Sequence, residues 1–337
     1  GTYGTLTISA NGSYSYVADQ AAAEALAVSD PPDLDIFSYQ ITDDQGATAT
    51  GTLTFSVTGT NDAPTVALTG NTPTASVVEA ADASSQEVDA SGTIYFEDLD
   101  SIDSLTISTG SIVVAGSLGV TVASSLSNAL IAAVSVSEGE QEGQANWSID
   151  TSGLDLDFLG DGETITVTVP VIATDESDAS VTEDAVITIT GSNDGPVLAV
   201  GAVALSVNEA TDASAQDISG SGTITFSDLD DIASITAASG SVSLSSGVTL
   251  PDGLEASLLA ALTFTDQGDN TADWDVSLAD LDLDFLDAGE TITLAFVVTA
   301  EDDQSETATD TISLVITGTN DNPTLSSSVN RDLVEAG

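Results

Sequence analysis

Three copies of a short Asn-Asp motif are the residues of this chain best suited to chemistry. The copies occupy residues 59–64, 191–196 and 318–323, and in each one Asn-Asp is followed by any residue and then Pro. Amide, carboxylate and backbone oxygens are the ligands of Ca²⁺, which takes about six to eight of them. A single copy would be interpreted as an ordinary polar turn, since Asn, Asp and Pro all favour turns.

The spacing of the copies favours metal binding over a simple turn. Asn61 and Asn193 are 132 residues apart, and Asn193 and Asn320 are 127 residues apart. These periods have the length of a domain. Each copy follows one alternating apolar segment and precedes another, so we interpret the copies as linkers between tandem domains. A joint of this kind can draw oxygen ligands from the loops of two domains.

The composition excludes several classes of function. The 337 residues include 55 Asp and Glu, one basic residue, no His and no Cys, with a formal net charge of -54. Nucleic acids and anionic membrane surfaces need a basic footprint, so neither is an expected partner. Hydrophobic residues make up 41% of the chain, which is enough for packed cores. No apolar run reaches the roughly 20 residues that span a bilayer, and we expect the chain to be an excerpt of a longer polypeptide.

β-branched residues that alternate with small polar ones predict the elements that position these motifs. The alternation runs through residues 52–58, 165–169, 185–190, 292–296 and 311–317. Turn signals such as Asn11-Gly12 and Asp161-Gly162 separate the segments. Only residues 21–26 and 254–262 have plausible helical patterning. The sequence therefore predicts an all-β fold of tandem antiparallel sandwiches of the Ig-like or cadherin-like type, arranged as an extended string.

Internal alignment divides the chain into repeats. The matched features are Glu79 with Glu209, Asp98-Leu99-Asp100 with Asp228-Leu229-Asp230, Trp147 with Trp274, and residues 154–159 with 281–286. We predict a partial repeat at 1–62 that holds only the later strands, a second repeat at 63–194 and a third at 195–321. Residues 322–337, which include Val334-Glu335-Ala336, are predicted to begin a truncated fourth repeat.

The repeat resembles a known bacterial family. Gly-Thr-Leu-Thr through Asn-Gly-Ser-Tyr-Ser-Tyr at 4–16, Phe-Ser-Tyr-Gln-Ile-Thr-Asp-Asp-Gln-Gly at 37–46 and the motif at 59–64 look like the VCBS repeat. Glu79, Gly92-Thr93 and Asp98-Leu99-Asp100 resemble its opening half, and the resemblance covers nearly the whole chain. It implies cadherin-like modules of giant RTX adhesins, exported by type I secretion to the bacterial surface and stiffened by Ca²⁺.

Strand direction partly sorts the acidic residues between the joints. Because successive strands run from end to end of a sandwich, the hairpin at Asp175 should lie at the same end as Asp98 and Asp100, opposite Asn193 and Asp194. Glu79 lies some 17 residues past the first linker, which at ~3.3 Å per residue allows one traverse of the domain.

The cadherin likeness implies the same sorting and completes the ligand sets. The joint between the first and second repeats would use Asn61, Asp62, Asp98, Asp100 and Asp175, with Asp33 or Asp35 added. The joint between the second and third would use Glu79, Asp155, Asp157, Asn193, Asp194, Asp228, Asp230 and Asp302. Glu209, Asp282, Asp284, Asn320 and Asp321 would face a fourth repeat.

Simpler interpretations of some residues stay open. Asp155 and Asp157 alternate with Leu, so they fit the solvent-facing side of a half-buried segment as well as they fit a metal site. Trp147 and Trp274 fit core packing better than sugar stacking, since both repeats place them alike.

The leading functional prediction is a monomeric spacer of calcium-locked repeats that projects a distal adhesive domain, with calcium and the neighbouring repeats as partners. The alternative is a ligand- or glycan-binding module, for which the 4% aromatic content gives thin support. We do not expect an enzyme, because a chain without His, Cys and Lys cannot form a His-based triad, a thiol nucleophile or a Schiff base. A carboxylate pair remains formally possible, but the candidate acids recur in successive repeats.

Overall fold

Strand β12 (Thr164–Thr174) shows how the alternating pattern becomes a half-buried strand. The side chains of Ile165, Val167 and Val169 point inward and are fully buried, while the residues between them are half-buried. β-branched side chains suit such a pleated, one-sided surface. The same pattern recurs along β21 (Thr291–Glu301), so the long strands follow directly from the sequence.

The computed structural model describes residues 1–28, 30–81, 88–100, 104–199, 204–211, 215–230, 234–237, 240–268 and 270–323. The predicted start of a fourth repeat lies outside them, apart from residues 322 and 323. The chain divides into two compact units, Gly1–Ser192 and Asn193–Gly337. Among the described residues, no helix is long and apolar enough to cross a membrane.

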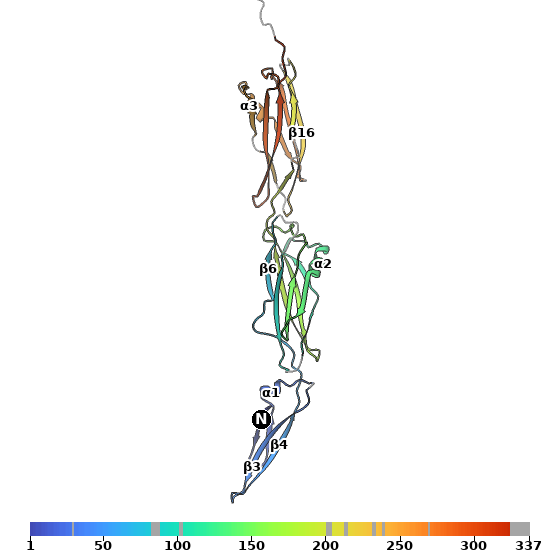
Figure 1. Ribbon diagram of the computed structural model, residues 1–337, viewed down its shortest axis with the longest axis vertical. Helices are drawn as coiled ribbons and strands as arrows, with labels where there is room; N and C mark the ends of the chain where they lie inside the picture. Colours follow the sequence, from blue (N-terminus) through green and yellow to red (C-terminus); the bar gives the residue numbers. More distant parts are fainter. Residues whose placement is uncertain are drawn as a thin grey trace, which may run out of the picture. The chain divides into compact units, whose positions relative to one another are not determined.

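The second repeat, defined here as β5 to β13, is a sandwich of two sheets. One sheet has the order β10-β11-β7-β5, and the other has the order β6-β13-β12-β8 with β9 also on β12. The helix α2 lies at the side of the sandwich (Figure 1). Besides β12, its elements are β5 (Thr65–Val66), β6 (Thr74–Val78), β7 (Ala90–Glu97), β8 (Thr106–Thr109), β9 (Val113–Gly116), α2 (Ser124–Ala133), β10 (Val134–Glu138), β11 (Gln144–Ile149) and β13 (Ser180–Thr190).

The third repeat, β14 to β22, has the same sheet orders, β14-β16-β20-β19 and β15-β22-β21-β17, with β18 also on β21. Besides β21, its elements are β14 (Val197–Ala199), β15 (Ala204–Asn208), β16 (Gln216–Ser227), β17 (Ser234–Ala237), β18 (Ser241–Leu244), α3 (Leu254–Leu259), β19 (Leu262–Asp266), β20 (Thr271–Leu281) and β22 (Thr307–Thr317). Identical connectivity in two repeats makes their positions directly comparable.

The first segment, residues 1–62, contains two separate strand pairs. β1 (Thr5–Ile8) pairs with β2 (Tyr14–Val17), and β3 (Asp33–Thr42) pairs with β4 (Thr48–Val57). A short helix, α1 (Ala21–Glu24), connects the pairs. These strands correspond to β10 to β13, because the motif of Gly, a hydroxyl residue and Asn-Asp begins within two residues of the end of both β4 and β13.

A buried tryptophan organises each complete core. Trp147 and Trp274 are both 2% exposed, which confirms the prediction that they belong to the core. Their indole rings lie across Gly92 and Gly222, where a Cβ atom would come within 2.4 Å and 2.8 Å of ring atoms. The glycine of the repeated Gly-Thr pair is therefore needed to make room for the ring.

The first segment has an aromatic core of its own. The rings of Tyr16 and Phe55 stack with centroids 4.2 Å apart, and Phe37 meets both of them edge-on at 6.0 Å and 5.9 Å. Such pairs add to the area burial of their side chains. The cluster holds the two strand pairs of this segment together.

The all-β fold class is confirmed, with three corrections. The sheets are not purely antiparallel, since β6 pairs with β13 and β15 with β22 in parallel. The helix α2 was not predicted, and it buries only Leu130 fully, so its amphipathic signal is weak. The two predicted helices end early, at Glu24 and Leu259, and Leu262, the last residue of the second predicted helix, is the first residue of the strand β19.

Candidate metal centre

The predicted ligands of the first joint lie together at one end of the second repeat. Asn61 Nδ2 donates a hydrogen bond to Asp175 Oδ2 at 2.9 Å, and the Asp62 N–H donates to Asp100 Oδ2 at 2.9 Å. Asp98 is two residues from Asp100 and accepts its N–H at 3.0 Å. We call Asn61, Asp62, Asp98, Asp100 and Asp175 the head cluster of the second repeat.

The third repeat has a head cluster of the same design. Asn193 Nδ2 donates to Asp302 Oδ2 at 2.9 Å, and the Asp194 N–H donates to Asp230 Oδ2 at 3.1 Å. The Asp230 N–H reaches Asp228 Oδ1 at 3.4 Å. Two sandwiches thus reproduce the same contacts between a linker and the same two loops.

Tight turns explain why Asp175 and Asp98 each direct only one carboxylate oxygen into the head cluster. Asp175 follows β12, and its Oδ1 accepts the N–H groups of Ser177 and Ala179 at 2.9 Å and 2.8 Å. Asp98 similarly uses Oδ1 for the Asp100 N–H. Asp side chains stabilise turns in this way. One oxygen of each carboxylate forms the turn, which leaves the other one for the cluster.

Several oxygens of the head clusters are buried and receive no hydrogen bond from any residue that the structure describes. They are Asn61 Oδ1, Asp98 Oδ2 and Asp100 Oδ1 in the second repeat, and Asn193 Oδ1 and Asp230 Oδ1 in the third. A buried polar atom without a partner costs about 1–3 kcal/mol. Because all these atoms are acceptors, they need either a cation or a hydrogen-bond donor, and a further acceptor cannot satisfy them.

The electrostatics of the second-repeat head cluster also favour a cation. Burial raises the pKa of Asp100, and the neighbouring charges of Asp98, Asp62 and Asp175 raise it further, although the Asp62 N–H opposes the shift. Burial would also raise the pKa of Asp175, but hydrogen bonds from Asn61 and the turn amides outweigh burial and lower it. The head cluster therefore combines Asp175, whose ionised form is stabilised, with Asp100, whose ionisation costs free energy.

Glu79 lies at the other end of the second repeat, beside the linker that leaves it. Its Oε1 accepts the N–H and the hydroxyl of Ser192 at 2.6 Å and 2.5 Å. Asp157 is 3% exposed and Asp155 is exposed, and the Asp157 N–H donates to Asp155 Oδ1 at 3.3 Å. Asp157 and Asp155 therefore differ in burial, although the sequence pattern treats them alike.

The third repeat places Glu209 in the corresponding position. Glu209 Oε1 accepts the hydroxyl of Thr319 at 3.1 Å, while Oε2 is buried without a partner. Burial raises the pKa of Glu209, and the charges of Asp321 and Asp284 add to the shift against the hydrogen bonds from Thr319. Asn320 is exposed and donates to the Asp321 carbonyl at 3.0 Å, and no Asp side chain of the described residues accepts from it as Asp175 does from Asn61.

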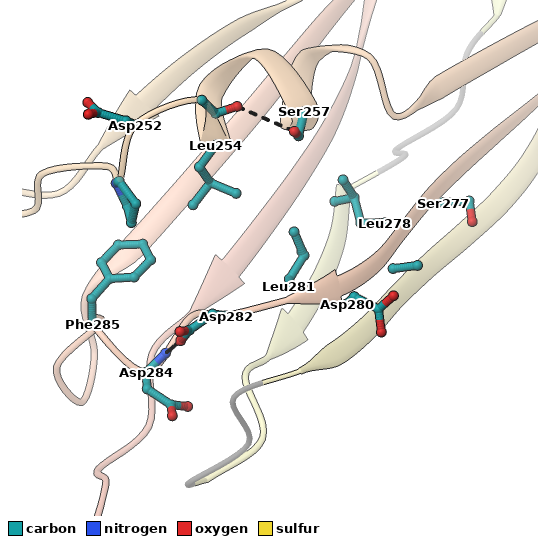
Figure 2. A pocket seen from close by; sticks show the side chains of 13 residues that line it. Asp252, Leu254, Ser257, Ser277, Leu278, Asp280, Leu281, Asp282, Asp284 and Phe285 are labelled. Carbon is teal, nitrogen blue, oxygen red and sulfur yellow. Dashed lines mark hydrogen bonds between the residues drawn. The ribbon is translucent and has the colours of Figure 1, made fainter.

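An open groove of about 900 Å³ lies beside α3 in the third repeat. Figure 2 shows Asp282 and Asp284 at its edge with Phe285 and Leu254 nearby, and the Asp284 N–H donates to Asp282 Oδ1 at 3.3 Å. Asp282 is thereby on the rim of a groove and exposed to solvent, not within a buried cluster.

Carboxylates alone do not form a metal site in the described residues. No group of three or more His, Cys, Asp or Glu side chains there is gathered closely enough to hold an ion. The head clusters instead mix Asn amide oxygens with carboxylates. A cation in a head cluster would need both kinds of ligand.

Two sets of contacts were not anticipated from the sequence. The hydroxyl residue before Asn-Asp, Ser192 or Thr319, anchors the glutamate of its own repeat, and its recurrence at Thr60 is the signal that could have revealed it. Asp35 accepts N–H groups of residues 2–4 and the Tyr16 hydroxyl, and Asp33 accepts the Tyr3 hydroxyl at 2.6 Å. Asp33 and Asp35 therefore hold the N-terminal residues of their own segment.

Residues 1–56 match the family described as "Bacterial Ig domain". No curated protein matches the sequence. The matched part is a sixth of the chain.

Several solved cadherin structures are similar to the chain. Protocadherin gamma B2 extracellular cadherin domains 1-5 shows 15% identity and a TM-score of 0.37, covering 86% of this chain and 46% of that one. Drosophila N-cadherin EC1-4 shows 15% identity and a TM-score of 0.27, covering 93% and 64%. Mouse Protocadherin-24 EC1-3 shows 14% identity and a TM-score of 0.31, covering 94% and 87%. The chain thus spans less than two thirds of the first two structures.

The chain is built from all-β sandwiches in tandem, and its residues 1–56 match a bacterial Ig family.

Proposed function

We propose that this chain is a calcium-rigidified spacer of a bacterial surface adhesin, exported by a type I pathway and related to VCBS repeats of RTX proteins. The observation that carries the proposal is the recurrence of buried acceptor oxygens without donors at equivalent positions of two repeats. Asn61 and Asn193 each leave Oδ1 unpaired, and Asp100 and Asp230 do the same. Chance defects in packing would not recur atom by atom.

The ligand types support calcium over other metals. The chain has no His and no Cys, which transition metals such as Zn²⁺ prefer, and the cluster offers only oxygen. Mg²⁺ demands a near-ideal octahedron and keeps several waters, whereas Ca²⁺ accepts irregular sets of amide, carboxylate and backbone oxygens. We therefore assign Asn61, Asp98 and Asp100, with their third-repeat equivalents, as calcium ligands.

The residues of each head cluster tie a linker to the sandwich that follows it. The hydrogen bonds from Asn61 and Asp62 already attach the first linker to the loops at Asp175 and Asp100. A bound Ca²⁺ supplies positive charge where the carboxylates repel one another. Fixing the linker in this way stiffens the chain, which suits a spacer that carries a distal adhesive domain.

Small-angle X-ray scattering of the full chain, with Ca²⁺ and then with a chelator, tests the proposal. We expect chelation to change the maximum dimension and to increase flexibility and cleavage by protease, while Mg²⁺ does not restore the calcium-bound state. The double variant Asp100→Asn/Asp230→Asn should respond only at a calcium concentration about 100-fold higher than the parent chain needs. The matched control replaces Asp184 and Asp310 by Asn, which removes the same charge from exposed strand positions.

An unchanged maximum dimension after chelation would count against rigidification by calcium. An equal response of the double variant and its control would count against the head clusters as the sites.

A further inference from the structure

The groove beside α3 in the third repeat has an apolar floor. Leu278 and Leu281 of β20 line the groove and are 5% and 6% exposed. Leu254 and Phe285 line it as well, and both are half-buried against the core of the repeat. Its volume of about 900 Å³ is within the range of binding sites, which is roughly 300–1,000 Å³. The floor can therefore take up large apolar side chains of a ligand.

Exposed carboxylates surround this floor. The aspartates of the rim are Asp252, Asp280, Asp282 and Asp284, and none of the residues that line the groove is basic. Figure 2 shows Asp252 and Asp280 on opposite sides of the leucine side chains. In the described part of the chain no three carboxylates are close enough to share a metal ion. The rim therefore suits separate positive charges on an extended ligand.

A β-bulge places Asp280 at the groove. β20 carries one extra residue where it crosses residues 216–218 of β16. The backbone of Asp280 is left-handed there, with a φ of 54°, and its N–H donates to Asp217 Oδ1 at 3.1 Å. Bulges bend a strand and redirect its side chains. The position of the Asp280 carboxylate is thus set by the sandwich itself and not by a loose loop.

The second repeat has uncharged residues where the third repeat has two of the rim aspartates. When the two core tryptophans are aligned, Gly153 takes the position of Asp280, and its φ of 79° is also left-handed. When α2 and α3 are aligned at their buried leucines, Ser124 takes the position of Asp252. Glycine adopts a left-handed backbone more readily than aspartate does. The two carboxylates are therefore required neither by the shared fold nor by the repeated calcium ligands.

The floor of the groove differs between the repeats as well. The same alignment places Thr151 of the second repeat at the position of Leu278. Thr151 is fully buried, and its hydroxyl accepts the Val88 N–H at 2.9 Å and donates to the Val88 carbonyl at 3.0 Å. The third repeat thus has an apolar side chain where the second repeat has a polar group that is satisfied internally.

We propose that this groove binds a cationic peptide segment of another protein, in which two basic residues flank large apolar residues. The apolar side chains lie on the leucines of the floor, and the basic ones pair with Asp252 and Asp280. Apolar contacts in such a site give affinity, and the charges of the rim give specificity and speed of association. The 337 residues include one basic residue, so a second copy of them does not supply the segment. The site uses no calcium and stands apart from the calcium proposal.

A fluorescently labelled peptide with the sequence Gly-Arg-Leu-Leu-Arg-Gly tests the inference on the full chain. Binding is followed by anisotropy at about 0.15 M salt, where the Debye length is about 8 Å. We expect saturable binding of one peptide per chain, equal in calcium and in chelator. Replacing both leucines of the peptide by glycine keeps its charge and should weaken binding by about tenfold or more, since the apolar contact is lost.

Two double variants of the chain form a matched pair. Asp252→Asn/Asp280→Asn should weaken binding by about fivefold, as expected for two exposed ion pairs. Asn tolerates the left-handed backbone at position 280, so the fold is kept. Asp184→Asn/Asp310→Asn removes the same charge from exposed strand positions and should bind as the parent chain does. Both variants should keep the parent response to calcium, which separates a failure of this inference from a failure of the calcium proposal.

Hydrogen exchange locates the bound peptide. New protection should cover residues 252–258 and 278–281. Absence of saturable binding, equal binding of the leucine-free peptide, or protection confined to other residues would overturn the inference. An equal loss of binding in the two double variants would also overturn it, because it would assign the attraction to the net charge of the chain.

Discussion

Replacing Asp100 by Asn should change the stability of the second repeat in opposite directions without and with calcium. Asp100 is 3% exposed, its Oδ2 accepts the Asp62 N–H, and its Oδ1 has no partner. The pKa of Asp100 is raised, so ionised Asp100 destabilises the fold at neutral pH. This free-energy cost is present at pH values above the raised pKa and vanishes below the ordinary Asp pKa. Asn keeps the acceptor for the Asp62 N–H and removes the charge.

The expected magnitudes follow from the unpaired oxygen and from mass action. Without calcium, Asp100→Asn should stabilise the repeat by about 1 kcal/mol, the lower end of the cost of a buried unsatisfied group. At a calcium concentration of about 100 times Kd, the parent chain gains about 2.7 kcal/mol. A loss of about 100-fold in affinity would leave the variant only ~0.4 kcal/mol of that gain. At about 4 °C per kcal/mol, the calcium-induced rise in Tm falls from roughly 11 °C to about 2 °C.

Tryptophan fluorescence during thermal unfolding measures this prediction. The chain has two Trp residues, so a Trp274→Phe background leaves Trp147 as the reporter of the second repeat. Asp184→Asn, which removes an exposed charge from β13, is the control and should show the parent response to calcium. The reasoning is refuted if Asp100→Asn shows the full calcium-induced rise, or if it melts below the parent in chelator.

Two further predictions concern the first segment and the core. Burial would raise the pKa of Asp35, but the hydrogen-bond donors around Asp35 outweigh burial and lower its pKa. Ionised Asp35 should therefore stabilise the first segment above the ordinary Asp pKa of about 3.9, and this stability should be lost as the pH falls through the lower pKa of the folded state. Hydrogen exchange of residues 2–4 should show this loss in acid, and Asp35→Asn should abolish the pH step; persistence of the step would assign it to another group. Trp147→Ala should destabilise the second repeat by about 3–5 kcal/mol, as expected for a buried aromatic. A calorimetric change below about 0.5 kcal/mol would indicate a surface position instead.

Much of the fold followed from local pattern because the strands are long and regular. The alternation in β12 has a period of two, and such a period with β-branched residues suits only a half-buried strand. The repeated Gly-Thr and Trp positions also marked the core, since equal placement in two repeats is expected of packing. The sequence alone thus determined the fold class and the place of Trp147 and Trp274 in the core.

Other features depended on contacts between distant residues. The parallel pairing of β6 with β13 joins residues more than 100 positions apart, and no local pattern specifies its direction. The helix α2 buries too little to produce a clear period. For the site, the sequence supplied the oxygen-bearing residues. Only the tertiary structure decided that the Asn61 amide group donates to Asp175 and leaves Oδ1 unpaired. It also decided that Asp157 is buried while Asp155 is exposed, and that Asp35 binds the N–H groups of the N-terminal residues. The reason is that burial and hydrogen-bond partners are set by long-range packing, whereas residue type and period are local.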